Sequence, residues 1–173
     1  MNVITCHVVL LTRSHSITAD IELHGERFSD LLNNTRQSAI PLLKTQVARL
    51  REPSRLIGQH SSAVIPKHQI VLAFEAKPSR ITERRLYGYV KKNQHHIFAL
   101  MDGVEVQGVV HTTDSLDIID TYRFITLNNQ QFVPITQAEV TFCDDERFLI
   151  KQDTVLVNIQ RLHYIAKLSP PAQ

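Results

Sequence analysis

The stretch MDGVEVQGVV, Met101 to Val110, contains the local signals that decide the fold class. An Asp-Gly pair between two runs of alternating apolar residues indicates a strand, a tight hairpin turn and a second strand. Gly108 stands inside the second strand, where a glycine marks a sharp bend or a close approach of another backbone segment. We therefore expect Gly103 and Gly108 to have structural roles in a small β-fold.

Other parts of the chain carry the same kind of signal. Short runs rich in Val, Ile and Phe alternate with polar residues in SITADIEL, RFITLN, QFVPITQAEVTF, TVLVNI and LHYIAKL, and this period of two predicts an all-β protein. The best helical candidate is Arg80 to Lys92, where Ser79 is a suitable cap. Gly88 and the alternation of Tyr87 and Tyr89 favour a strand by its end, so both interpretations stay open for this segment.

Composition restricts the class of protein. The chain has 173 residues, of which 43% are hydrophobic and 21% charged, with a formal net charge of +2. These values are typical of a folded domain rather than a disordered chain. Cys6 and Cys143 form no C-x-x-C pattern, which argues against a zinc knuckle or a disulfide-stapled secreted fold. No run approaches the ~20 apolar residues of a membrane span and the amino terminus lacks a basic signal region, so we expect a cytoplasmic protein that binds no membrane.

The sequence resembles itself at two related offsets. A shift of 87 residues superposes HSITADIELHGERFSDLLNN on DGVEVQGVVHTTDSLDIIDT, and a shift of 92 superposes AVIPKHQIVLA on VLVNIQRLHYI. The superposed pairs include Ile17 and Val104, Asp30 and Asp117, Leu31 and Ile118, and Leu32 and Ile119. Two amphipathic strands can match by chance, but two matches in the same order favour an internal duplication.

The duplication predicts two small barrels, because short sheets lose their exposed edges by closing. We expect a first barrel over residues 1–75, a linker over 76–85, a second barrel over 86–168 and a disordered tail over 169–173. Each half is too small to bury a large core, so the two halves are expected to pack on each other.

The hairpin motif resembles that of the Sm-like superfamily, the five-stranded barrels that include Lsm proteins and the bacterial RNA chaperone Hfq. The resemblance rests on Asp102-Gly103 at the turn, Gly108 in the next strand and Asp114 six residues later. It implies two tandem, divergent Sm-like or SH3-like barrels of five strands each. The first half departs from this motif, since Ile21 stands where the second half has Gly108.

A second motif in the first half is similar to the Lys-His-x-Ile of Hfq, where the Lys and His help line the RNA pore. Lys67-His68-Gln69-Ile70 carries this likeness, although Pro66 replaces the aromatic residue of the family. The resemblance implies that Lys67 and His68 contact RNA. The second half has neither Lys-His nor the Arg-Gly of eukaryotic Sm proteins, and the segments RFSDLLNN and SLDIID are additional to ordinary Sm proteins.

The strongest binding signal in the residues themselves is KPSRITERRLYGYVKK, Lys77 to Lys92, which has six basic residues and one acidic residue. Basic groups neutralise phosphates and tyrosines offer stacking faces, so single-stranded RNA is a suitable ligand. The candidate RNA contacts in this segment are Arg84, Arg85, Tyr87, Tyr89, Lys91 and Lys92. The alternative is a solvated linker followed by an ordinary strand. Acidic residues at the start of the second half could instead dock the halves or successive subunits.

Other candidate sites have simpler structural explanations. His95 and His96 are adjacent in a predicted strand and point to opposite faces, so they are poor ligands for one metal ion. The acidic stretch 143–146 has no regular calcium-ligand spacing and suits the tip of a hairpin. Asp30 and Asp117 are expected to cap local turns. No phosphate-binding glycine loop, G-x-S-x-G or H-E-x-x-H motif is found in the sequence.

Together these patterns favour a non-enzymatic binding or assembly protein without a cofactor, which acts through the edges and faces of its barrels. Its partner is expected to be another protein or a second copy of itself. The alternative is an Hfq-like RNA-binding protein that does not bind DNA. A small metal-dependent hydrolase is the remote alternative.

Overall fold

A computed structural model describes residues 3–76, 93–112, 117–127, 130–143 and 145–168 of the chain. The first part contains β1 (Ile4–Leu11), β2 (His15–Leu23), α1 (Phe28–Asn33), β3 (Ala39–Arg49), β4 (Glu52–Pro66), the 3-10 helix η1 (Lys67–Gln69) and β5 (Leu72–Glu75). The second part contains β6 (Asn93–Met101), β7 (Val104–Thr112), α2 (Ile118–Leu127), β8 (Phe132–Phe142), β9 (Asp145–Asn158), η2 (Ile159–Arg161) and β10 (Leu162–Lys167). We call the part from β1 to β5 the first half and the part from β6 to β10 the second half.

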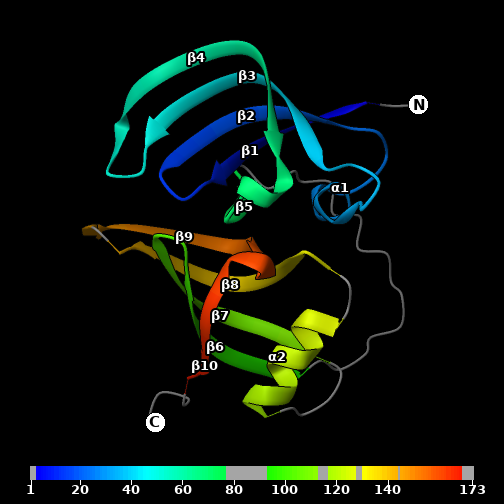
Figure 1. Cartoon of the computed structure of the whole chain (residues 1–173), viewed down its shortest axis with the longest axis vertical. Helices are drawn as coiled ribbons and strands as arrows, with labels where there is room; N and C mark the ends of the chain where they lie inside the picture. Colours follow the sequence, from blue (N-terminus) through cyan, green and yellow to red (C-terminus); the bar gives the residue numbers. More distant parts are fainter. Residues whose placement is uncertain (1–2, 77–92, 113–116, 128–129, 144, 169–173) are drawn as a thin grey trace.

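The ten strands in the described part of the chain belong to one antiparallel sheet, which confirms the all-β fold class. The strand order is β10-β6-β7-β8-β9-β5-β1-β2-β3-β4. Figure 1 shows the two halves one above the other, with curved strands in each, and they meet where β5 lies beside β9. At this junction Leu72 pairs with Val157 and Ala73 pairs with Leu156.

The prediction of two closed barrels is wrong, because the sheet is open and continuous through both halves. The physical reason is the position of β5. This four-residue strand pairs with β1 on one side and with β9 of the other half on its second side. Pairing between the halves engages backbone groups of β5 and β9 that closure of the barrels would otherwise have engaged, and it leaves the outer edges of β4 and β10 free.

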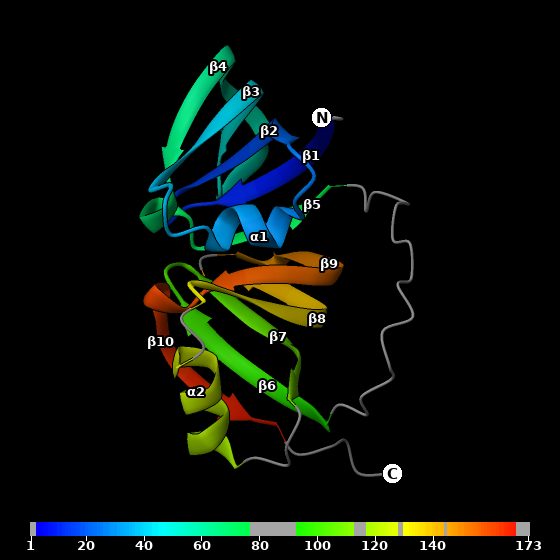
Figure 2. The ribbon, with the colours of Figure 1, turned by 90° about the vertical axis from the view of Figure 1, so that its right-hand side faces the viewer.

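The order of elements is the same in both halves: two strands, an α-helix, two strands, a 3-10 helix and a last strand. The order of strands within each half is also the same. The additional segments form helices, and Figure 2 shows α1 at the boundary between the halves and α2 beside β10. The prediction of a strand at RFITLN is wrong, since most of it lies in α2. Asp117 precedes this helix and its carboxylate accepts a hydrogen bond from the backbone nitrogen of Asp120 at 2.7 Å.

The residue correspondence from the 87-residue shift is also wrong in detail. Leu10 in β1 pairs with Ile17, whereas Ala99 at the matching place in β6 pairs with Val106 rather than Val104. The first hairpin has a longer turn than the second, which explains the difference. The helices diverge further. Their two apolar pairs occupy unlike environments: Leu31 and Leu32 are buried, Ile118 is half-buried and Ile119 is exposed.

Two hydrophobic cores hold the sheet together, and each one includes side chains from both halves. Phe132 and Leu156 of the second half are buried in the core that the first half mainly forms. Leu11, Leu72 and Phe74 of the first half are buried in the core of the second half. Since each half completes the core of the other, we expect them to form one structural unit.

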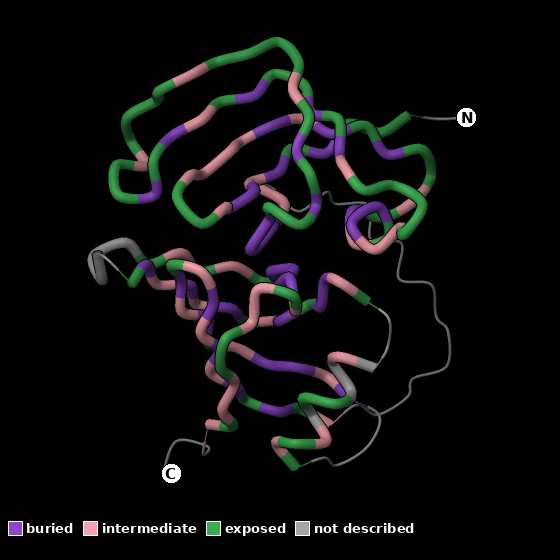
Figure 3. Tube along the Cα trace, in the orientation of Figure 1, coloured by how far each residue is buried: buried purple, intermediate pink, exposed green. Residues whose placement is uncertain are grey.

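The two outer strands of the sheet are β4 and β10. Figure 3 shows that β4 is largely exposed, whereas β5 at the centre of the sheet is buried. Exposed apolar side chains on β4 include Leu56, Ile57 and Val64, and Tyr164 is exposed on β10. Within the described residues, each of these strands has a strand neighbour on one side only. Their free edges are therefore the surfaces at which the sheet can be extended.

Candidate functional site

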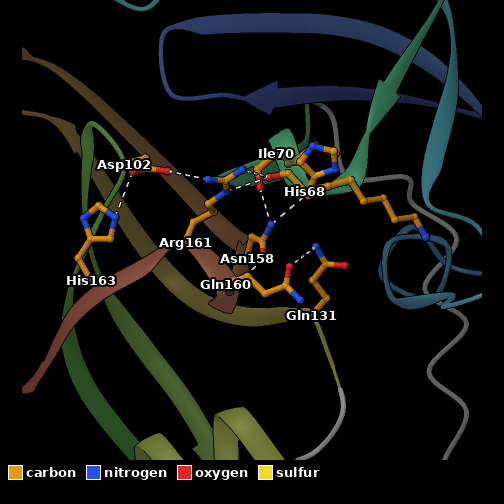
Figure 4. A network of polar contacts seen from close by, with 9 residues as sticks. His68, Ile70, Asp102, Gln131, Asn158, Gln160, Arg161 and His163 are labelled. Atoms are coloured by element: carbon orange, nitrogen blue, oxygen red, sulfur yellow. Dashed lines mark hydrogen bonds and ion pairs between the residues drawn. The ribbon is translucent and has the colours of Figure 1, made fainter.

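A network of polar contacts lies at the junction between the halves, where η1 and η2 follow β4 and β9 (Figure 4). Asn158 is fully buried at its centre. Its side-chain nitrogen donates to the carbonyl oxygen of Ile70 at 2.7 Å, and its backbone nitrogen donates to the carbonyl oxygen of Val71 at 3.0 Å. Its side-chain oxygen accepts from the backbone nitrogen of Gln160 at 3.1 Å, which starts the η2 turn. One asparagine thus ends β9, caps η2 and binds the first half.

Arg161 forms a second bridge between the halves. Its Nε donates to the carbonyl oxygen of His68 at 2.8 Å, and Nη2 donates to the same oxygen. Its Nη1 lies 3.4 Å from Oδ2 of Asp102, and the other oxygen of Asp102 lies 3.1 Å from Nε2 of His163. Asp102 is part of the predicted Asp-Gly turn, so this turn also orients the arginine that reaches the first half (Figure 4).

Lys67, a predicted RNA contact, is buried and has a structural role. Its Nζ donates to the carbonyl oxygens of Leu31 at 2.6 Å and Asn34 at 2.8 Å, at the end of α1. A cation is favourable there, because the last carbonyls of a helix lack partners within the helix. Burial lowers the pKa of the Lys67 ammonium, and the nearby carboxylate of Glu26 acts in the opposite direction. Its charge is directed to the backbone of α1 and does not face the solvent.

The helix α1 contacts the second half through Asn33. The Asn33 side chain donates to the carbonyl oxygen of Phe132 at 2.9 Å and accepts from the backbone nitrogen of Phe132 at 2.8 Å. A polar hollow of about 280 Å³ lies beside this contact, and its lining includes Asn33, Lys67, His68, Gln131 and Gln160. Amide groups from both halves therefore face one small cavity.

A larger hollow of about 370 Å³ lies at another part of the boundary between the halves. Three arginines, Arg13, Arg49 and Arg51, line it together with His15. Guanidinium groups suit planar or tetrahedral oxyanions, so this hollow has the chemistry to bind a phosphate or carboxylate.

The two predicted structural glycines occupy tight positions. Gly103 has a φ of 75° in the β6–β7 turn, a conformation that favours glycine. Gly108 lies at an irregularity in the pairing of β7 with β8. A Cβ atom at Gly108 would lie 2.5 Å from Cγ2 of Ile135 and 2.8 Å from the carbonyl oxygen of Thr136. A side chain at this position would need a shift of the backbone or of a buried isoleucine.

Of the other predicted site residues, Asp30 and Asp117 lie at the starts of α1 and α2. Asp30 accepts a hydrogen bond from the backbone nitrogen of Arg27 at 3.2 Å. Asp114 of the Sm-like motif lies outside the described residues, as do the six predicted RNA contacts in the basic segment, Arg84, Arg85, Tyr87, Tyr89, Lys91 and Lys92. The structure therefore brings only Lys67 and His68 of the predicted RNA site to the junction.

The histidines and cysteines of the described residues have identifiable surroundings. His95 is buried with its Nε2 at 2.8 Å from the Thr112 hydroxyl, and the same nitrogen of His111 lies 2.8 Å from the hydroxyl of Thr136. Within the described part of the chain, no group of three or more potential metal ligands is found. Burial, with a contribution from the Glu75 carboxylate, raises the pKa of the Cys6 thiol to about 12. This thiol is therefore protonated at neutral pH, and a neutral thiol is a poor nucleophile.

Sequence reasoning missed the main residues of the junction: Asn33, Gln131, Asn158, Gln160 and Arg161. The repeat contained one usable signal, because the shift of 92 residues places Asn158 on Pro66. A buried-strand pattern that ends in asparagine is unusual enough to suggest a capping role. Its long-range partners depend on the contact between β5 and β9, which no local pattern contains.

Comparison with protein-family models, curated proteins and solved structures finds no match to this chain. Among the described residues, no helix has the length and apolar character that crossing a membrane would require.

Proposed function

We propose that this chain is a non-enzymatic assembly protein that binds other polypeptides by extending its β-sheet at the outer strands. The observation that carries this proposal is the β4 edge, a 15-residue outer strand whose residues are mostly exposed. Leu56, Ile57 and Val64 add apolar surface to this strand. Long exposed edges with apolar side chains are prone to pair with a further strand, and β-strand addition is a common mode of peptide recognition.

The junction between the halves supports the proposal, because it is an example of edge pairing within the same chain. There β5 and β9 join by backbone pairing, and Asn158 and Arg161 bind carbonyl groups across the contact. The polar groups of this network are engaged with one another. Lys67 is likewise engaged with the end of α1. Such a network is suited to holding two strands together.

We further infer that the halves are divergent copies of one Sm-like unit. The repeated order of elements and the repeated order of strands support this inference. The Asp-Gly turn and Gly108 in the second half are the residues that most resemble the Sm-like pattern. In this interpretation, assembly through strand edges is a property of each unit.

Hydrogen–deuterium exchange of the whole protein at low and high concentration tests edge-mediated association. The expected result is slower exchange of β4 backbone amides at high concentration, since amides that point away from β3 gain carbonyl partners. The amides of β5 and β9 serve as the internal control, because they are already paired within one chain. Unchanged exchange along β4, at concentrations where the protein remains folded, would contradict self-association through this edge. If an added cellular polypeptide slows the exchange of β4 backbone amides, that polypeptide is a different partner for the same surface.

A second candidate function is single-stranded RNA binding, and the arginine-lined hollow is the observation that favours it. Arg13 and Arg49 could neutralise phosphates there, whereas the buried charge of Lys67 could not. Fluorescence polarisation with labelled oligouridylate tests this function. Affinity that falls steeply with salt, and falls again in the Arg13→Gln, Arg49→Gln double variant, would support it. An RNA affinity that changes neither with salt nor in the double variant would exclude a role for this hollow.

A further inference from the structure

We propose that the hollow lined by Arg13 and Arg49 is a binding site for a small amphipathic anion, namely a phosphate monoester of an apolar alcohol. The phosphate group binds the two guanidinium groups, and the apolar group lies in a groove that adjoins the hollow. This inference concerns a different property from assembly through strand edges and does not depend on it.

Four hairpin turns frame the hollow, two from each half. Arg13 lies in the β1–β2 turn and Leu50 lies in the β3–β4 turn. Gly103 lies in the β6–β7 turn, and Phe142 is the last residue of β8 before the β8–β9 turn. Figure 1 shows these four turns on the left-hand side of the molecule. The site is therefore built from both halves and would not exist in either half alone.

Backbone contacts hold the four turns together. The nitrogen of Leu50 donates to the carbonyl oxygen of Ser14 at 3.0 Å, which joins the two turns of the first half. The nitrogen of Cys143 donates to the carbonyl oxygen of Gly103 at 3.1 Å, which joins the two turns of the second half. A Cβ atom on Gly103 would lie 3.2 Å from the carbonyl oxygen of Arg13, so the turns of the two halves approach closely. The rim of the hollow is thus formed before a ligand binds, which lowers the cost of binding.

The positive charge of the hollow is available to a ligand. The exposed Arg55 has an ion pair with Glu52, whereas neither Arg13 nor Arg49 has a carboxylate within ion-pair distance in the described part of the chain. Among the described residues that line the hollow, none is acidic. A phosphate monoester carries a charge of about −1.5 to −2 at neutral pH and has three acceptor oxygens. It therefore matches two guanidinium groups better than a singly charged carboxylate does.

An apolar groove of about 180 Å³ adjoins the hollow. Leu50 and Phe142 line both of them, so one molecule can occupy the hollow and the groove together. Leu11, Leu149 and Ile150 also line the groove, and Leu149 has an exposed fraction of 47%. An apolar chain in the groove would remove this surface from water, which favours binding.

The lining favours an apolar chain over a nucleobase. Proteins that bind single-stranded RNA stack its bases on open aromatic faces. Among the described lining residues, Phe142 is the only Phe, Tyr or Trp, and its exposed fraction is 5%. The volume of the hollow, about 370 Å³, lies within the range of about 300–1,000 Å³ that is typical of small-molecule sites. Size and lining together therefore indicate a small amphipathic molecule.

Isothermal titration calorimetry of the whole protein with octyl phosphate tests the proposal, in a phosphate-free buffer and below the concentration at which micelles form. We expect one molecule to bind per chain. Inorganic phosphate lacks the chain and octanol lacks the charge, so they serve as the two matched ligands. Each buried CH₂ group raises affinity about fourfold, and octyl phosphate should bind at least about tenfold more tightly than inorganic phosphate. An equal affinity for either matched ligand would overturn the two-part site.

A pair of double variants tests the place of the phosphate group. Arg13→Gln with Arg49→Gln should lower the affinity for octyl phosphate at least about tenfold, because charge-assisted hydrogen bonds are lost. Arg36→Gln with Arg123→Gln is the matched control, since it removes the same charge from exposed residues that do not line the hollow. The control should keep the wild-type affinity. Equal affinities of the two double variants would overturn the assignment of the hollow.

Leu149→Ser tests the groove separately. This variant should bind octyl phosphate more weakly and inorganic phosphate as the wild type does, because only the apolar surface changes. An unchanged affinity for octyl phosphate would overturn the place of the chain. Oligouridylate provides the last comparison. If it binds in a manner that depends on Arg13 and Arg49 while octyl phosphate does not bind, the hollow serves RNA and the proposal is overturned.

Discussion

At the scale of single residues, Gly108 shows how a small sheet limits its sequence. The strand β7 approaches β8 so closely here that a Cβ atom would overlap Ile135 and the backbone of Thr136. The absence of a side chain permits this contact and the irregularity in strand pairing next to it. A larger residue would push apart two strands that also carry the core of the second half.

Gly108→Val is therefore expected to destabilise the protein by about 1–3 kcal/mol through overpacking and strain. Urea unfolding followed by circular dichroism measures this change in the free energy of unfolding. Gly58→Ala is the matched control in β4, because the nearest atom to its new Cβ would be Nε2 of the exposed, movable His60 side chain at 3.0 Å. Equal stability of the Gly108→Val and Gly58→Ala variants would refute the packing role of Gly108.

A second residue-scale prediction concerns acid stability. The hydrogen bond from His7 lowers the pKa of the Asp20 carboxyl, with help from Lys44. Between the folded and unfolded pKa values the unfolded chain binds more protons, so stability rises with pH in that window. This contribution is complete above the unfolded value of about 3.9 and is lost as pH falls through the lower folded value. We expect Asp20→Asn to flatten the pH dependence of the urea midpoint below about pH 4, and an unchanged profile would exclude this role of Asp20.

Single residues could be predicted to different extents. The Asp102-Gly103 turn was predictable because its conformation depends on adjacent residues, and Gly103 has the expected positive φ. Lys67 was predicted as an exposed RNA contact, yet it is buried against the end of α1. The direction of a lysine depends on the elements packed around it, and the helix α1 was itself not expected from the sequence.

At the scale of elements, the turn from β9 into η2 determines how the halves join. Asn158 connects three elements through hydrogen bonds, and it does so without any solvent exposure. Its loss would leave the carbonyl of Ile70 and the amide of Gln160 without their partner. Unsatisfied buried groups of this kind cost more free energy than the average hydrogen bond contributes.

Asn158→Ala is expected to destabilise the protein by about 1–3 kcal/mol, and for a chain of this size each kcal/mol lowers Tm by about 2–4 °C. Calorimetry measures the change. Gln160→Ala is the matched control two residues away, because the Gln160 side chain is exposed and, among the described residues, accepts a hydrogen bond only from Gln131, at 3.3 Å. A Tm of Asn158→Ala as high as that of Gln160→Ala would show that the junction does not depend on this network.

Element types were predictable where one face of a strand is buried and the other is solvated. The alternating pattern predicted β2, β7 and β8 for this reason. The run RFITLN was mistaken for a strand because Ile, Phe and Thr favour strands in isolation. In the structure a capping aspartate begins the helix, and Arg123 lies 3.3 Å from Asp120 one turn earlier. Local hydrogen bonds of this kind outweigh a modest strand preference.

At the scale of the whole molecule, the open sheet replaces the two closed barrels that the sequence favoured. The repeat correctly suggested two halves with similar strands, but the pairing of β5 with β9 is a contact between residues far apart in the chain. Because the short strand β5 can pair on both sides, its local hydrogen bonds favour closure of a barrel and extension of the sheet almost equally. The shared cores, in which Phe132 and Leu72 cross between halves, favour the extended arrangement.

An extended sheet with two free outer strands is the basis of the proposed assembly. Each end of this sheet exposes a large apolar side chain, Val64 on β4 and Tyr164 on β10. Natural sheets commonly protect their edges with charge or proline, and here Pro53 and Pro66 stand only near the two ends of β4. The remaining edge is available for a further strand.

Sedimentation velocity over a wide range of protein concentration tests this assembly most directly. The monomer has a mass of 19.8 kDa, and we predict that the wild-type mass rises above this value with concentration. Val64→Asp should shift the mass back towards that of the monomer, because it places a charge in the apolar surface of β4. A single 19.8 kDa species of the wild type at every concentration would contradict assembly of this chain through its sheet edges.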